Sequence, residues 1–147
     1  MRHHLVVLHD HYLKLMLTGR KRIECRLSSV RRPPFNAVSP GDLLWLKLPS
    51  RPVRALATAG RCLFRELRSG ADLVELIDQH VDHICAVDGF FKGAAEWARY
   101  VSLIWIETVV VIDSLPVYKS DKRAWVALDR MPVPGLRLGY GHSIART

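Results

Sequence analysis

Apolar residues recur along the chain in short runs separated by turn-forming residues, a pattern that predicts a sheet of short strands. Most of these runs are rich in β-branched and aromatic residues, which favour strands. The predicted strands cover residues 5–8, 21–27, 43–48, 53–64, 102–112 and 123–128. A bulge is expected at Gly60, inside the fourth strand, and the Pro40-Gly41-Asp42 turn precedes the third strand.

Three other segments have the spacing of helices. The first lies between Asp10, the expected N-cap, and Gly19, the expected residue after the helix end. Its apolar face consists of Tyr12, Leu13, Met16 and Leu17. Ser69-Gly70-Ala71-Asp72 resembles a capping box and begins a longer helix. The apolar positions of that helix are Leu73, Leu76, Ile77, His80, Val81 and Ile84. A short helix is expected over 94–100, and together these elements favour a small mixed barrel with two or three helices.

Composition and charge limit the classes of protein to which this chain can belong. Hydrophobic residues make up 49% of the 147 residues, which is enough for the core of one folded domain. The net charge of +8 attracts polyanions, although a basic surface without a nucleic-acid partner has the same charge. Three cysteines without a CxxC pair argue against a disulfide framework and favour a reducing cytoplasm. The apolar stretch 101–115 contains Glu107 and Asp113 and is too short to span a membrane.

The densest cluster of charge is Gly-Arg-Lys-Arg-Ile-Glu-Cys-Arg at residues 19–26. Gly19 can adopt the positive φ that ends a helix tightly, and Lys21 then follows a helix C-terminus, where a cation is favoured. In a strand, Arg22, Glu24 and Arg26 share one face, and Ile23, Cys25 and Leu27 share the other. The charged face is interpretable as an ion-pair ladder at a barrel rim. It is also suited to a phosphate or a base edge, with Glu24 orienting an arginine or accepting from an exocyclic amine.

The spacing Gly19-x-Lys21-x-x-Glu24-x-Arg26 resembles the GxKxxExR signature of the ASCH family, a relative of the PUA RNA-binding domain. The preceding strand and short helix and the later Pro40-Gly41-Asp42 turn agree with that family. The resemblance implies an α+β fold: a PUA-like small mixed β-barrel flanked by two or three helices, with a cleft beside the first helix. The expected domain covers 1–130 with a helical insert at about 69–100, and 131–147 is expected to be an extended C-terminal tail.

The resemblance implies RNA binding, or recognition of a modified nucleotide, through this cleft. The candidate binding residues are Lys21, Arg22, Glu24, Arg26, Arg20, Arg31, Arg32 and Tyr12. The alternative is a small hydrolase acting on nucleic acid or nucleosides, either a ribonuclease or an N4-acetylcytidine amidohydrolase. In the amidohydrolases the motif resembles GxKxxTxR, with the Lys and Thr as the proposed catalytic pair. Lys21 and Glu24 are then the catalytic candidates, but Glu24 lacks the hydroxyl, which shifts the expectation from catalysis to binding.

Other features add less. His9 with His11, and His80 with His83, lack a third ligand at a recognised spacing, so no metal is predicted. No complete nucleotide-binding glycine motif is present, so no cofactor is predicted. Trp45, within an apolar strand, is expected in the core. A protein-interaction role for a helix over 71–84 stays open, as does the oligomeric state.

Overall fold

The computed structural model describes residues 1–86, 91, 93–120, 122–139 and 142–144. The strands are β1 (His3–Val7), β2 (Ile23–Ser28), β3 (Leu43–Lys47), β4 (Val53–Glu66), β5 (Tyr100–Leu115), β6 (Val117–Lys119), β7 (Trp125–Leu128), β8 (Leu136–Gly139) and β9 (His142–Ile144). The helices are α1 (Asp10–Leu17), α2 (Gly70–Asp78), α3 (Val81–Ile84) and α4 (Ala94–Trp97). All six predicted strands are present, with ends shifted by a few residues.

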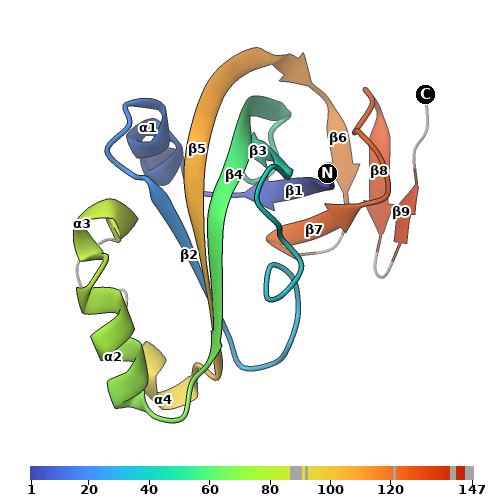
Figure 1. The fold of residues 1–147 in the computed structure, drawn as a ribbon. Coiled ribbons are helices and arrows are strands. Elements are labelled where there is room, and N and C mark those ends of the chain that lie inside the picture. Colours follow the sequence, from blue (N-terminus) through green and yellow to red (C-terminus); the bar gives the residue numbers. More distant parts are fainter. Residues whose placement is uncertain (87–90, 92, 121, 140–141, 145–147) are drawn as a thin grey trace.

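Six strands form one curled sheet in the order β2-β5-β4-β3-β1-β7, drawn in Figure 1. β1 runs parallel to β3, and the other neighbours are antiparallel. The pairing of β4 with β5 shifts register between Thr58 and Ala59 and again between Ala59 and Cys62. These irregularities surround Gly60 and confirm the predicted bulge, which helps a long strand curve into a half-barrel.

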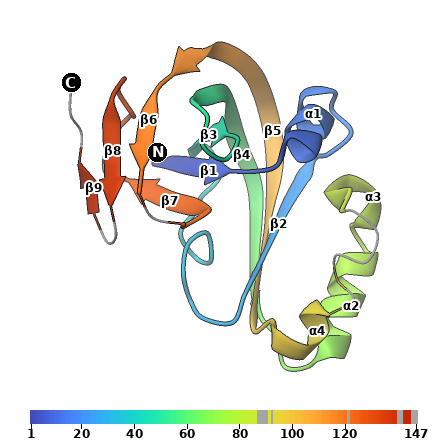
Figure 2. The ribbon, with the colours of Figure 1, turned by 180° about the vertical axis from the view of Figure 1, so that it is seen from behind.

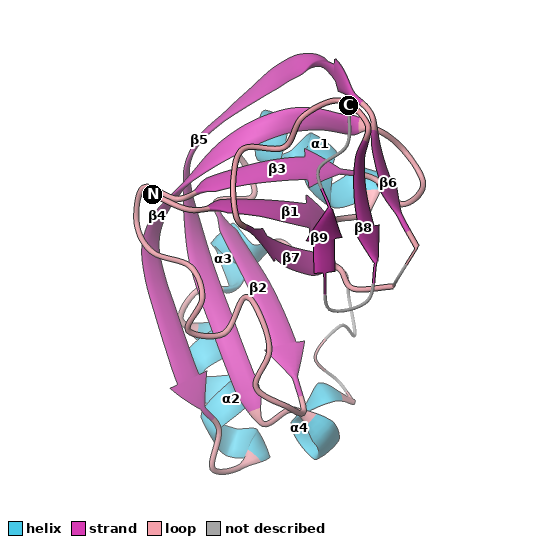
Figure 3. Ribbon diagram, turned by 90° about the vertical axis from the view of Figure 1, so that its right-hand side faces the viewer, coloured by secondary structure: helices cyan, strands magenta, loops and turns pink. Residues whose placement is uncertain are grey.

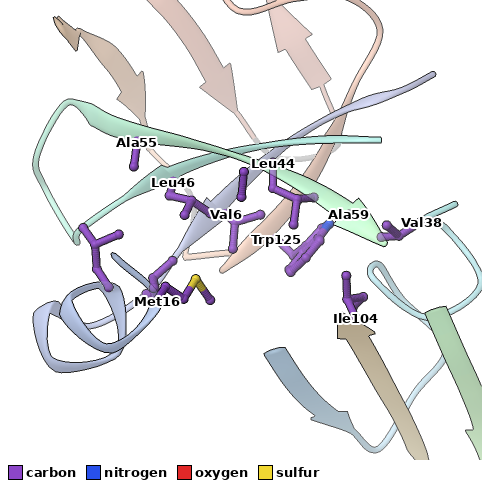
Figure 4. Close-up of a cluster of buried hydrophobic side chains, with 12 residues drawn as sticks. Val6, Met16, Val38, Leu44, Leu46, Ala55, Ala59, Ile104 and Trp125 are labelled. Atoms are coloured by element: carbon purple, nitrogen blue, oxygen red, sulfur yellow. The ribbon is translucent and has the colours of Figure 1, made fainter. Parts of the chain in front are cut away.

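Helix α1 covers one part of the half-barrel and completes its main core. Leu13 and Met16 are buried beneath the helix, and Figure 4 shows Met16 directed toward Val6 and Leu46 of the strands. The helix begins one residue earlier than predicted: His9 is the N-cap and Asp10 is the first helical residue. Asp10 forms an ion pair with Lys14 instead of capping, with 2.8 Å between Oδ2 and Nζ.

The predicted long helix after Ser69 is two helices. Ser69 accepts a hydrogen bond from the backbone N–H of Asp72, so the predicted cap is confirmed. The helical spacing continues past Asp78, but α2 ends there and α3 begins at Val81, which is 49% exposed rather than on a buried face. Figure 2 shows α2, α3 and α4 together on the side of β2. Their apolar side chains form a second core with Ile23 and Cys25.

Within the segment expected to be an extended tail, β8 and β9 form strands. β8 pairs in parallel with β6, and β9 pairs with β8, giving a three-stranded sheet beside β7, visible in Figure 3. Leu136 and Leu138 are buried in a cluster that includes Trp45, which lies in the core as predicted. Leu136 and Leu138 lie on the same face of β8, and their side chains cover one end of the half-barrel. Among the described residues, no helix is long and apolar enough to cross a membrane.

A buried polar chain fixes the first strand to the turn before β3. The indole N–H of Trp125 donates to His4 Nδ1 at 3.1 Å, and His4 Nε2 lies 2.9 Å from Asp42 Oδ2. His4 must therefore carry its proton on Nε2, and burial lowers the His4 pKa. Burial opposes ionisation of Asp42, but hydrogen bonds from His4 and from two backbone N–H groups outweigh it and lower the Asp42 pKa. The pair is thus a hydrogen bond between neutral imidazole and carboxylate.

Candidate functional site

The charged motif lies on β2, and the strand separates its side chains as the sequence predicts. Ile23 and Cys25 are buried on the side of α2, and burial, reinforced by the nearby Glu24 carboxylate, raises the pKa of the Cys25 thiol to about 12. Arg26 reaches β1 and β7, through Val7 O and the Trp125 ring, and the Glu24 carboxylate lies beside its guanidinium. The structure therefore places Glu24 and Arg26 in one cleft, which Cys25 and Leu27 also line, whereas Ile23 is not among its lining residues.

Lys21 is a buried anchor at the entry to this strand. Gly19 has a φ of +80°, which turns the chain after α1. Lys21 is 3% exposed, and its Nζ donates to Ile23 O at 2.9 Å and Ile84 O at 2.5 Å. Ile84 is the last residue of α3, so the ammonium lies at the C-terminus of that helix, where a cation is stabilised. Lys21 therefore joins the helical insert to the barrel.

Glu24 links the two cations of the motif. Its Oε1 lies 3.6 Å from Lys21 Nζ and accepts from the Cys25 backbone N–H at 3.1 Å. Its Oε2 lies 3.4 Å from Arg26 Nη2. A carboxylate has about four lone-pair positions, so Oε2 retains capacity for a further donor. Because the carboxylate is only 8% exposed, its charge acts in a partly desolvated site.

Arg26 spans the opening between the two edge strands of the six-stranded sheet. Its Nη2 donates to Val7 O of β1 at 2.9 Å, and its guanidinium lies 5.4 Å from the centroid of the Trp125 ring on β7. The cleft therefore lies where β2 and β7 fail to pair and the half-barrel stays open. Arg26 is fixed by three contacts, and about a fifth of its side chain stays exposed to solvent.

The cleft has a volume of about 430 Å³, within the range of small-ligand sites. We call it the motif cleft; its characteristic residues are Tyr12, Lys21, Glu24, Arg26 and Trp97. The Tyr12 ring lies 5.1 Å from Lys21 Nζ. Trp97 comes from α4 and is 50% exposed, an unusual state for a tryptophan. Sequence reasoning missed Trp97, because its place in a short helix carries no signal of what it faces.

The remaining predicted arginines do not gather in the motif cleft. Arg20 and Arg22 are exposed and are not among its described lining residues. Arg31 forms an exposed ion pair with Glu66, 3.2 Å from Nη2 to Oε2. Arg32 lines a neighbouring cavity of about 370 Å³, which also contains Arg26. Of the predicted set, four residues share the motif cleft: Tyr12, Lys21, Glu24 and Arg26.

The histidines show no metal-binding arrangement in the described part of the chain. No group of three or more His, Cys, Asp or Glu side chains there is close enough to hold a metal ion. His80 is half-buried and packs edge-on against Trp105, with 5.2 Å between the ring centroids.

Comparison with known proteins places the fold. No family model and no curated protein match the sequence. Among solved structures, the chain is similar to a tyrosine-to-phenylalanine mutant of ZmASCH from Zymomonas mobilis, with a TM-score of 0.61 and 14% identity over 78% of this chain and 76% of that chain. A serine-to-alanine mutant of the same protein gives a TM-score of 0.60 and 14% identity, over 77% and 72% of the two chains.

The curled sheet, its flanking helices and the open edge beside α1 define a PUA-like α+β protein. More particularly, the chain has the fold of the ASCH domain, as the motif at residues 19–26 predicts. At 14% identity the likeness establishes the fold and leaves the activity to the residues of the site.

Proposed function

We propose that the motif cleft binds a base of RNA. The observation that carries this proposal is a preorganised carboxylate and guanidinium, Glu24 and Arg26, in a cavity of about 430 Å³ lined by two aromatic rings. Sequence-specific RNA recognition commonly uses unstacked bases, which stack on aromatic or guanidinium planes and form hydrogen bonds through their edges. Tyr12 and Trp97 supply such planes, and the basic surface attracts the phosphates.

The hydrogen-bonding groups favour a base with an exocyclic amine. Glu24 Oε2 is an acceptor with capacity beyond its contact to Arg26. Adenine, cytosine and guanine carry an exocyclic amine that donates to such an oxygen, and uracil does not. The carboxylate is already oriented by Lys21 and the Cys25 backbone N–H, so little ordering is lost on binding. Poly(C) and poly(A) should therefore bind more tightly than poly(U).

The chemistry of the cleft favours binding over hydrolysis through a covalent intermediate. Among the described lining residues there is no serine or threonine. The Cys25 thiol, with a pKa of about 12, is a poor nucleophile at neutral pH. The Lys21 ammonium is directed at two carbonyl oxygens and a carboxylate, which suits an anchor rather than a base.

Fluorescence anisotropy with a labelled single-stranded RNA of random sequence tests the proposal. Arg26→Gln should weaken binding by about 1–3 kcal/mol, the value of a well-placed arginine contact. Trp97→Ala should cost a similar amount, about 1–3 kcal/mol, for a lost stacking surface. The matched control is Arg65→Gln, which removes the same charge from an exposed position near the end of β4, outside the cleft. Equal affinities for the cleft variants and the control would refute the assignment.

A further inference from the structure

A larger cavity, of about 980 Å³, lies next to the motif cleft. It is bounded by the turn between β3 and β4 and by β6 and β8, the strands of the small sheet in Figure 3. Three residues line both spaces: Val7, Pro49 and Ala124. The two cavities therefore lie side by side at the end of β1 and have these three residues in common.

The charged residues described around this second cavity are all basic. We call it the cation groove; its six basic residues are Lys47, Arg51, Lys119, Lys122, Arg123 and Arg137. None of the described residues lining it is acidic. Asp121 lies outside the described residues, and counting it against the six still leaves an excess of five positive charges. Such a concentration of like charge in a concave surface focuses a positive potential on an anionic ligand.

Lys47 shows that the cations are held in place despite their repulsion. Its side chain is only 4% exposed, and its Nζ donates to Leu48 O at 2.9 Å. Burial and the nearby Lys119 charge both lower the Lys47 pKa. A buried ammonium facing another cation is costly unless an anion approaches it. A bound phosphate would offset this repulsion, which makes the groove complementary to an anion rather than to a neutral ligand.

The pairing of β6 with β8 sets the positions of the arginines in the groove. Arg137 on β8 lies 5.5 Å from the centroid of the Tyr118 ring on β6. Arg123 Nη2 donates to Gly139 O at 2.8 Å, at the end of β8. These contacts orient two guanidinium groups against the small sheet, and guanidinium donors suit phosphate oxygens.

We propose that the cation groove binds the phosphates of an RNA strand whose base occupies the motif cleft, so that the ligand is a polynucleotide and not a free nucleoside. This inference rests on the function proposed above, since the cleft supplies the base contact. The groove adds affinity through counterion release, independent of sequence, and the cleft adds the base preference. Affinity should therefore increase with strand length until the groove is filled.

The experiment compares a cytidine monophosphate, an oligocytidylate of about ten nucleotides and inorganic tripolyphosphate on the full chain. The groove variant is Arg51→Gln/Arg137→Gln, because both side chains are exposed and their loss leaves the core intact. The charge-matched control is Arg65→Gln/Arg99→Gln, at the opposite end of the sheet near α2 and α4. Each lost phosphate contact lowers the salt slope for single strands by about 0.7, or about 1.4 for two contacts.

For the groove variant we expect about 25-fold weaker oligonucleotide binding at 0.1 M salt, the factor that a slope change of about 1.4 gives over one decade. Binding of the monophosphate should stay within twofold, roughly the scatter of surface substitutions. A groove variant indistinguishable from the control overturns the groove alone, because the cleft is tested separately by the preference of Arg26→Gln for poly(C) over poly(U). Tripolyphosphate that binds as tightly as the oligonucleotide, and loses affinity equally in the groove variant, overturns the strand path in favour of a polyphosphate site.

Discussion

Replacing Lys21 with methionine removes a buried ammonium while keeping most of the side-chain volume. The substitution leaves the Glu24 carboxylate without the cation 3.6 Å away and leaves Ile84 O without its donor at the end of α3. Breaking one side of a buried ion pair costs about 3–5 kcal/mol. Glu24 keeps Arg26 at 3.4 Å and the Cys25 N–H at 3.1 Å, so we expect the lower end, about 3 kcal/mol.

Urea unfolding followed by circular dichroism measures this change in the free energy of unfolding. The control is Lys14→Met, which removes an exposed cation paired with Asp10, and should change stability by less than about 0.5 kcal/mol. If the cost comes from the stranded charge, the double variant Lys21→Met/Glu24→Gln should be more stable than the sum of the single effects by at least about 1 kcal/mol. The role of Lys21 as a buried anchor would be refuted if Lys21→Met lowers the free energy of unfolding by less than about 1 kcal/mol, or if the effects in the double variant are strictly additive.

Three further predictions concern stability and reactivity. His4 is neutral with a lowered pKa in the folded chain, whereas in the unfolded chain it is protonated near the ordinary pKa of 6.5. The unfolded state therefore binds more protons, and the free energy of unfolding should fall as pH drops below about 6.5. His4→Gln should make the urea midpoint depend less on pH between about pH 5 and 7.5, and an unchanged pH dependence would contradict this. Gly70→Ala would place a Cβ 2.9 Å from Ala95 Cβ and should destabilise the fold by about 1–2 kcal/mol in thermal unfolding. The control is Gly93→Ala, whose added Cβ meets nothing within 4 Å. Equal melting temperatures for the two variants would argue against the close packing of α2 on α4. Cys25, with a thiol pKa of about 12, should resist iodoacetamide at neutral pH in the native protein and react in urea, as mass spectrometry would show; rapid native labelling would exclude its burial.

The sequence predicts those elements whose conformation depends mainly on residues close to them in the chain. The alternation of Ile23 and Cys25 against Glu24 and Arg26 is a property of any strand with one apolar face, so the two sides of β2 follow from the sequence. Gly60 likewise marks the bulge of β4 through its missing side chain. The motif also predicted the fold, through its resemblance to the GxKxxExR signature of the ASCH family.

Contacts between distant segments account for what the sequence does not reveal. Leu136 and Leu138 form too short a run to predict a strand, and they become one by pairing with β6. The helical spacing continues through His80, yet α3 separates from α2, and Lys21 binds the carbonyl of Ile84 across 63 positions. The cation groove is equally non-local, since Lys47 and Arg137 come from strands far apart in sequence.

The motif residues hold the fold as well as forming the candidate site, and this affects how a binding experiment is interpreted. Arg26 joins β2 to Val7 of β1 and to the Trp125 ring of β7, so it bridges the opening of the half-barrel. Arg26→Gln therefore removes a structural contact together with a ligand contact. A structural role alone would weaken poly(C) and poly(U) equally, through a smaller folded fraction. A base contact held by Glu24 and Arg26 would reduce the preference for poly(C) over poly(U) at equal folded fraction, so this ratio, and not the affinity, decides between the two roles.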